Sequence, residues 1–283
     1  MNRKTYEIPH PDAHPELPVE RGPDDRGVGW WVPGKKHRLL ADYVEATWPA
    51  RSKFSHRVFI DLFCGPGRVQ VAGQSETLDG GAVVAWRQSQ RMAAGAFTHV
   101  FVGDKAPDRV DACVARLKAA GAPAVGFAGP ASVTATQVRA LVPRGSLCLA
   151  YLDPYNLQYL SFDIIKTLAA LPKIDFAVHF SVMDLKRNVL TEIDRRRFDA
   201  AVPGWQQRID AQAMPTHRLA DAFFDLWCEE VAALGFKVSR RMPLIATSHG
   251  APIYRLVFLT RHELPDSIWH DIAQEATRDL FGD

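Results

Sequence analysis

The chain has 283 residues, of which 47% are hydrophobic and 23% are charged, and its formal net charge is +2. This composition indicates a globular chain with a sizeable core, and the charge neither requires nor excludes nucleic acid as a partner. No stretch approaches the roughly 18 apolar residues that span a bilayer, and the first residues lack the apolar segment of a secretory signal.

The cysteines are scattered and form no Cys-x-x-Cys pair; they are Cys64, Cys113, Cys148 and Cys228. This spacing argues against a zinc site and against a disulfide framework, and it is typical of a reducing compartment. We therefore expect a cytoplasmic protein with no metal site.

Residues 1–28 are rich in proline, histidine and charged residues and show little periodicity, so they are expected to form a flexible N-terminal arm. Residues 29–283 are expected to form a single domain. Within the segment that joins arm and domain, Trp30 and Trp31 either stack on a base or pin the arm to the core, and the second interpretation is favoured.

A helix is predicted from about Lys35 to Trp48, with Pro49 as its stop signal. Its first turn carries Lys36 and His37, whose positive charge opposes the helix macrodipole. Cations placed there either face a ligand, which makes Lys36 and His37 candidate substrate-binding residues, or form a solvated helix end. The solvated helix end is the favoured interpretation.

Short buried runs alternate with amphipathic segments through the next part of the chain. The predicted strands cover about 58–60, 98–102, 124–128, 146–152 and 175–181, and the predicted helices cover about 80–94, 107–120, 132–142 and 161–171. Residues 68–79 are expected to form a loop. Strict alternation of strands and helices predicts a doubly wound parallel sheet.

Beyond Met183 the pattern changes. Residues 184–213 are dense in charge and are predicted to form a helical insertion, a possible substrate or partner region. A helix at about 216–234, a hairpin of 236–242 with 253–259, and a closing helix follow. The whole predicts an α/β, Rossmann-like class I methyltransferase fold with a mostly parallel seven-stranded sheet and a C-terminal antiparallel hairpin.

The first predicted strand ends in Asp61 and runs into a Gly-Pro-Gly turn at Gly65 and Gly67. Glycines there let the backbone approach a ligand, and such turns at the carboxyl edge of an α/β sheet bind nucleoside cofactors. The alternative is a tight connection between two elements, although packing alone does not explain an acid at Asp61. Cys64 belongs to this candidate cofactor-binding turn, as a small apolar filler rather than a nucleophile.

Asp104 ends the second strand, where an acid accepts both hydroxyls of a ribose. It lies about 40 residues beyond the glycines, whereas the dinucleotide rule expects about 20. A simple strand-end turn is the alternative. After the third strand, where many methyltransferases present an acid to the adenine, this chain has none, and Ser132 or a backbone amide is the candidate replacement.

The fourth strand ends in Asp153-Pro154-Tyr155-Asn156, which resembles the Asp-Pro-Pro-Tyr motif of methyltransferases that act on amino groups of nucleobases. In that motif the acid accepts hydrogen bonds from the amine and the aromatic ring stacks on the base. The resemblance implies a catalytic role for Asp153, Pro154 and Tyr155, and substrate binding by Asn156. Alternatively, Asp153 caps the next helix or holds a turn.

Three other polar groups have two interpretations each. His179 on the fifth strand is interpreted as a core histidine rather than a base. Arg187 and Asn188 are candidate substrate-binding residues, and with the run 195–197 they either contact nucleic acid or form a solvated helix face. The solvated face is favoured.

Several motifs together resemble the three-Cys-motif partner protein family (TcmP). They are Trp31, Lys36-His37 and Tyr43, then Ile60 to Arg68, then Gly80-Gly81-Ala82, then Leu152 to Tyr155, then Lys186-Arg187-Asn188, then Tyr254 to Thr260. Members typically have Ala where this chain has Cys64 and Ser-Pro where it has Gly81-Ala82. The resemblance covers about residues 30–282 and implies a methyltransferase-like protein that accompanies a radical-type protein bearing a three-cysteine motif.

The leading hypothesis is an S-adenosylmethionine-dependent methyltransferase that acts on an amino group of a nucleic acid base. The alternative is a non-catalytic partner or scaffold of a radical-type three-Cys-motif protein. A nicotinamide-dependent dehydrogenase is disfavoured, because the turn lacks a third glycine and has Pro66 between its two glycines.

Overall fold

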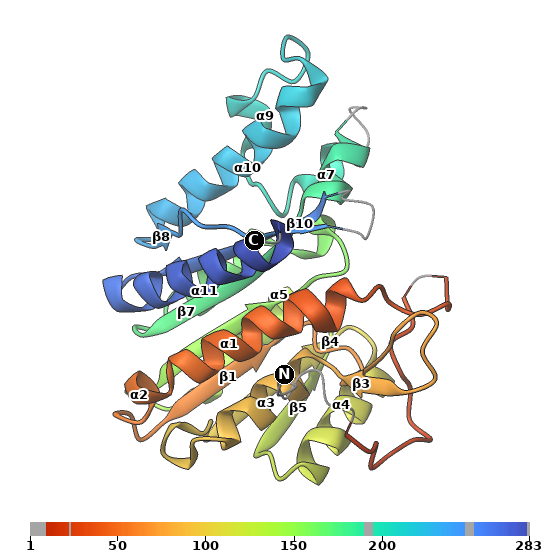
Figure 1. Cartoon of the computed structure of the whole chain (residues 1–283). Helices are drawn as coiled ribbons and strands as arrows, with labels where there is room; N and C mark the ends of the chain where they lie inside the picture. The colour runs from red at the N-terminus through yellow and green to blue at the C-terminus, as the bar shows by residue number, and fades with distance from the viewer. Residues whose placement is uncertain (1–9, 23, 190–194, 247–251, 282–283) are drawn as a thin grey trace.

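A computed structural model of the chain describes residues 10–22, 24–189, 195–246 and 252–281 (Figure 1). A twisted sheet forms its centre, with the order β5-β4-β1-β6-β7-β10-β8. Its strands are β1 (Arg57–Asp61), β4 (His99–Asp104), β5 (Ala124–Ala128), β6 (Leu147–Leu152), β7 (Ile174–Ser181), β8 (Lys237–Val238), β9 (Leu244–Ala246) and β10 (Pro252–Thr260). The first five pair in parallel, and β10 is antiparallel to β7.

Both β8 and β9 pair with β10, β8 at its end and β9 at its beginning. They occupy one position at the edge of the sheet, so the described strands fill seven positions in the order 3-2-1-4-5-7-6. This order, with the seventh strand antiparallel, is the class I methyltransferase fold, as the sequence predicts. The predicted hairpin turn at residues 248–250 lies outside the described residues.

The helices largely follow the predicted segments. They are α1 (Arg38–Ala46), α2 (Trp48–Arg51), α3 (Gly81–Gln90), α4 (Pro107–Ala119), α5 (Ala131–Leu141), α6 (Phe162–Leu168), α7 (Val182–Asn188), α9 (Trp205–Arg208), α10 (Thr216–Ala233) and α11 (Glu263–Phe281). The predicted stop at Pro49 is wrong: α1 already ends at Ala46, and Pro49 lies in the first turn of α2, where a proline fits. No helix in the described residues combines the length and apolar character that crossing a bilayer requires.

Alternating side chains of the strands supply two apolar layers, one on each face of the sheet. On β1, Val58 and Ile60 pack into the layer that contains Phe223 and Trp227 of α10. Phe59, between them, packs into the opposite layer with Tyr43 of α1. Figure 1 shows α1, α3 and α11 covering the same face. Both faces of the sheet are thus covered. Because five of its strands are parallel, the polar residues that follow their carboxyl ends gather at one edge of the sheet.

Residues 68–79, expected to be a loop, instead contain an antiparallel hairpin of β2 (Arg68–Gln70) and β3 (Thr77–Asp79). The N-terminal arm runs along this hairpin, shown in red beside β3 in Figure 1, and forms parallel bridges from Glu20 to Val69 and from Val28 to Val71. The flexibility of residues 1–28 stays a prediction. The described part of the arm contacts the domain.

The segment 184–213 contains α7, a short 3-10 turn at Arg196–Phe198 and α9 among its described residues. Arg196 and Arg197 are exposed, as the solvated-face interpretation expects. Arg195 is buried and donates a hydrogen bond to the Val189 carbonyl, so that interpretation is wrong for Arg195.

Candidate active site

A cavity of about 1260 Å³ opens at the carboxyl edge of the sheet, between the arm, β1, β4, β6, α7 and β10. Every site residue expected from the sequence lines it: Lys36, His37, Asp61, Cys64, Gly65, Gly67, Asp104, Ser132, Asp153, Pro154, Tyr155, Asn156, Arg187 and Asn188. Their roles stay predictions, but the structure brings them together. Below, the part around Gly65 and Asp104 is called the Gly-turn end, and the part around Asp153 the Asp153 end.

The turn after β1 requires both of its glycines. Gly65 has φ +55° and Gly67 has φ +78°, in the left-handed region that disfavours other residues. A Cβ at Gly65 would lie 3.2 Å from Nη2 of Arg109, and a Cβ at Gly67 would lie 3.2 Å from Cα of Cys113. The turn is therefore a backbone cradle that added side-chain atoms would crowd.

Cys64 is buried inside this turn, and its backbone N–H donates to the Gly103 carbonyl at 2.9 Å. Burial raises the pKa of its thiol well above the usual value, so the thiol stays protonated. The filler interpretation of Cys64 fits this environment.

Asp104 connects the turn to the next strand. The N–H of Gly65 donates to Oδ2 of Asp104 at 3.2 Å, and the N–H of Ala106 donates to Oδ1 at 3.0 Å. Nε of Arg109 lies 3.5 Å from Oδ2, and Arg109 also donates to Glu20 of the arm. Asp104 is thus held at the cavity wall with a cation beside it.

Asp61 is only 2% exposed and accepts a hydrogen bond from the N–H of Phe63 at 3.0 Å. Burial, followed by the negative charges of Asp153 and Asp104, raises the pKa of its carboxyl well above the usual range. A ligand cation next to Asp61 would favour the ionised form, so this carboxyl is a candidate partner for an ammonium group.

At the Asp153 end, Nζ of Lys36 donates to Oδ1 of Asp153 at 2.5 Å. The ammonium also lies 4.1 Å from the centre of the Tyr254 ring and 5.1 Å from that of Trp31. Burial alone would raise the pKa of Asp153, but the Lys36 ammonium holds it below its usual value. Asp153 is therefore an ionised carboxylate paired with a buried lysine, and it is the Lys36 amine that lies against the two aromatic rings. Burial lowers the pKa of Lys36, and the negative charge of Asp153 opposes that shift.

The favoured interpretation of Lys36 and His37 as a solvated helix end is wrong, because they are only 4% and 3% exposed. They belong to a π-helical turn at Val32–His37, and both line the cavity. Burial lowers the pKa of His37 to about 4, so His37 is neutral near pH 7. The sequence did not indicate this burial, since charge alone favours the solvent.

His179 is fully buried on β7, as expected of a core histidine, with burial lowering its pKa to about 3. It nevertheless lies close to the site: its Nδ1 is 4.0 Å from Oδ1 of Asp153. Its ring contacts those of Tyr151 and Tyr254 edge-on, at 5.1 and 5.9 Å between centres. A neutral imidazole thus supports the wall behind Asp153.

The rim of the Asp153 end carries exposed aromatic rings and α7. Tyr155 is 63% exposed and Tyr159 is 47% exposed. Asn188 donates to Asp184 at 2.7 Å, and Asp184 also accepts from the N–H of Leu157 at 2.8 Å. α7 is thereby tied to the segment that follows Asp153.

Several lining residues were not expected from the sequence: Glu20, Arg109, Asp184 and Tyr254. Asp184 and Arg109 follow strand ends closely, which is a usable signal. Glu20 and Tyr254 carry no local signal, because the arm and the antiparallel strand reach the cavity only through tertiary packing. Among the described residues, no three His, Cys, Asp or Glu side chains gather as a metal site would require.

No family model and no curated protein matches the chain, so the resemblance to the TcmP family gains no support from these comparisons. Solved structures are similar only in outline. Protein LPL1258 from Legionella pneumophila has 9% identity and a TM-score of 0.49, over 87% of this chain and 92% of that one. An O-methyltransferase from Bacillus cereus, solved in complex with SAH, has 11% identity and a TM-score of 0.45, over 88% and 86%.

Cofactor-bound Rv0187 from MTB is similar at 14% identity and a TM-score of 0.45, over 81% of each chain. At such low identity and TM-score these likenesses carry no argument about activity. The fold assignment rests on the strand order and on the antiparallel seventh strand.

Proposed function

We propose that this protein transfers a methyl group from S-adenosylmethionine to an amino group of a nucleic acid base. The observation that carries the proposal is the meeting of Asp61, Asp104 and Asp153 around one cavity, beside the Gly65–Gly67 cradle. In this fold, nucleoside cofactors bind outside the carboxyl ends of the strands.

The Gly-turn end suits the cofactor. The cradle at Gly65 and Gly67 would leave backbone room for the amino acid part of the cofactor, and Asp61, which lines the same cavity, would pair with its ammonium. Asp104, fixed by two backbone N–H groups, would accept from the ribose hydroxyls. Ser132 lies in the same wall, as a candidate for the adenine side.

The Asp153 end suits an amine acceptor. An ionised carboxylate has about four lone-pair positions, and in the described structure Asp153 receives Lys36 and, at 3.5 Å, the Tyr151 hydroxyl. Its side chain remains 18% exposed, so positions remain for an amine in the cavity. An amine held there has its lone pair directed by the hydrogen bonds that it donates.

S-adenosylmethionine supplies a methyl group already activated on a sulfonium, so the protein contributes mainly orientation and exclusion of water. Asp153 orients the acceptor amine and can receive the proton that the amine releases. The exposed ring of Tyr155 would stack on the acceptor base, a contact worth about 1–3 kcal/mol. In a duplex this geometry requires the base to be flipped out.

One observation favours the alternative of a non-catalytic partner. Two of the three candidate acids are already engaged by cations of the chain: Asp153 by Lys36, and Asp104 by Arg109. Such engagement would also suit a scaffold that keeps the fold without turnover. The partner implied by the TcmP resemblance, a radical-type three-Cys-motif protein, stays a prediction.

Two measurements on the purified protein test the proposal. Calorimetric titration with S-adenosylmethionine and S-adenosylhomocysteine is expected to give saturable binding. Transfer of a labelled methyl group to single-stranded RNA and DNA is expected to yield an N-methylated base in nuclease digests. Absence of binding at millimolar cofactor would remove the enzyme hypothesis, whereas binding without transfer to any acceptor would support the scaffold.

A further inference from the structure

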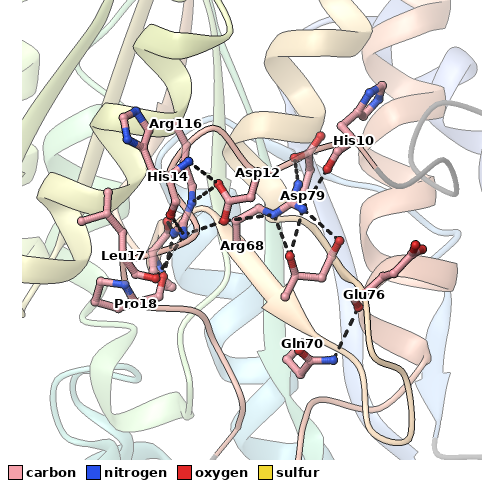
Figure 2. A network of polar contacts seen from close by, with 12 residues as sticks. His10, Asp12, His14, Leu17, Pro18, Arg68, Gln70, Glu76, Asp79 and Arg116 are labelled. Atoms are coloured by element: carbon pink, nitrogen blue, oxygen red, sulfur yellow. Dashed lines mark hydrogen bonds and ion pairs between the residues drawn. The ribbon is translucent and has the colours of Figure 1, made fainter.

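The N-terminal arm is held to the domain by an unusually complete set of contacts with one arginine. Arg116 of α4 is 4% exposed and donates to Asp12 twice, from Nε at 3.0 Å and from Nη2 at 2.8 Å (Figure 2). It also donates to the carbonyls of His14, Leu17 and Pro18. All three guanidinium nitrogens of Arg116 thus bind the arm.

The same arginine binds the Gly-Pro-Gly turn. Nη1 of Arg116 donates to the Pro66 carbonyl at 2.7 Å and to the Pro18 carbonyl at 2.6 Å. Pro66 stands between the two cradle glycines. One guanidinium therefore bridges the arm and the proposed cofactor turn.

A second arginine reinforces the latch. Nε of Arg68 lies 3.8 Å from Oδ2 of Asp12, and its Nη1 donates to Asp79 at 2.7 Å (Figure 2). Arg68 also donates to the His10 carbonyl at 2.9 Å. The side chains of Asp12, Arg68 and Arg116 are 10%, 4% and 3% exposed, so these charges are little screened by water.

Further along, the arm enters the cavity itself. Glu20, Gly22, Gly27 and Val28 line it, and Glu20 donates and accepts backbone hydrogen bonds with β2. The Glu20 carboxylate binds Arg109, which in turn lies against Asp104. Gly27 packs so closely that a Cβ there would lie 2.5 Å from the Ala72 nitrogen. Without the arm the Gly-turn end would lose one wall.

We propose that Asp12 and Arg116 form a latch that positions the arm and the Gly65–Gly67 turn together, so that cofactor binding and docking of the arm are coupled. The inference rests on the proposed function for the identity of the ligand, while docking of the arm stands on its own contacts. Arg116 is a positioning residue: it acts through the turn and the arm. By thermodynamic linkage, a bound cofactor stabilises the docked arm as much as the docked arm strengthens cofactor binding.

The test uses the full chain with Asp12→Asn, which removes the charge and keeps the side-chain shape. Arg21 and Arg26 have exposed side chains and lie between the two bridges that join the arm to the hairpin, at Glu20 and Val28. Trypsin needs a locally opened backbone to cleave, so faster cleavage at these arginines reports undocking of the arm. We expect Asp12→Asn to speed this cleavage, and to weaken S-adenosylhomocysteine binding by about tenfold, mainly through faster dissociation. Saturating S-adenosylhomocysteine is expected to slow the cleavage of the wild-type arm and to protect the variant arm less.

Two further variants separate a latch from a general structural effect. Asp12→Glu keeps the charge and is expected to restore part of both readouts. Glu229→Gln, in helix α10, breaks an exposed ion pair with Arg208 of α9. It is expected to leave the cleavage rate and the affinity for S-adenosylhomocysteine unchanged.

The outcomes are distinct. Unchanged cleavage in Asp12→Asn would overturn the latch. Faster cleavage with unchanged affinity for S-adenosylhomocysteine would overturn the coupling. If the wild-type protein binds no S-adenosylhomocysteine, the proposed function and the coupling both fall, and the cleavage rates alone decide whether the latch exists.

Discussion

The two ends of the cavity hold their charged groups in different ways. At the Asp153 end, the side chain of Lys36 is 5% exposed, and its Nζ lies 2.5 Å from Oδ1 of Asp153. The same Nζ lies against the rings of Trp31 and Tyr254. At the Gly-turn end, the side chain of Arg109 is 34% exposed and lies 3.5 Å from Asp104. The Lys36–Asp153 pair interacts strongly and is costly to leave unpaired, whereas the more exposed Arg109–Asp104 pair is better screened by water.

The comparison teaches which measurement each end should affect. Changes to the Lys36–Asp153 pair are expected to alter stability and pH dependence together with transfer, because a buried partner is left behind. Changes at the Gly-turn end are expected to alter cofactor affinity with smaller electrostatic effects.

The largest effect is expected from Asp153→Ala. It removes the proposed acceptor carboxylate and leaves the Lys36 ammonium buried without its partner. We expect transfer to fall by about 10²–10³-fold and the free energy of unfolding to fall by about 3 kcal/mol. S-adenosylhomocysteine binding is expected to persist. Transfer assays, denaturant unfolding and calorimetry measure the three quantities.

The double variant Asp153→Leu with Lys36→Met serves as the control, because it removes both charges at once. Stability is expected to recover and transfer to remain lost. Full turnover in Asp153→Ala would show that the acceptor site lies elsewhere.

Lys36→Met alone is expected to shift the pH dependence. In the wild-type protein the pKa of Asp153 lies below its usual value, so its ionised form contributes stability above the unfolded pKa of about 3.9. This contribution is lost as the pH falls through the lower, folded-state pKa. Without the ammonium, burial raises the pKa, and the acid limb of activity and stability moves to higher pH.

The pH profile of kcat/KM and unfolding at several pH values measure this shift, together with a loss of about 3 kcal/mol of stability near neutral pH. Lys36→Arg keeps the charge and should retain most of the wild-type acid limb. An unshifted profile in Lys36→Met would mean that Lys36 does not control the ionisation of Asp153.

Tyr155→Ala tests the exposed rim of the Asp153 end. Removal of a stacking ring is expected to weaken binding of a single-stranded acceptor by about 1–3 kcal/mol and to leave cofactor binding unchanged. Because the ring is 63% exposed, stability should barely change. Tyr155→Phe keeps the ring and is the matched control. Equal acceptor KM values in all three proteins would argue against stacking.

The smallest effect is expected from Gly67→Ala at the Gly-turn end. The left-handed φ and the close Cys113 backbone predict that an alanine at position 67 strains the turn by about 1–2 kcal/mol. This strain is expected to weaken cofactor binding, because the turn forms part of the proposed cofactor site. Gly121→Ala is a matched control, because Gly121 has φ +80° and nothing within 4 Å of an added Cβ. Both variants should lose stability, and only Gly67→Ala should bind S-adenosylhomocysteine more weakly.

The alternation of buried runs and amphipathic segments determined the sheet and the place of the strand-end acids. Asp61, Asp104 and Asp153 could be predicted to meet, because the carboxyl ends of parallel strands lie at one edge. The tight turn could also be predicted from its two glycines, and their φ values of +55° and +78° are in the region that favours glycine. These features follow from local pattern and backbone sterics.

Tertiary structure alone decided how the charges pair. Lys36 meets Asp153 across 117 residues, and Arg116 meets Asp12 across 104. Charge patterning in the sequence favoured a solvated helix end for Lys36. The pattern holds no information about the aromatic rings and the carboxylate that replace water around this buried amine in the folded chain. Nor does it show that the arm closes one wall of the cavity. Such pairings depend on which distant surfaces the packed core brings together, and no local pattern carries that information.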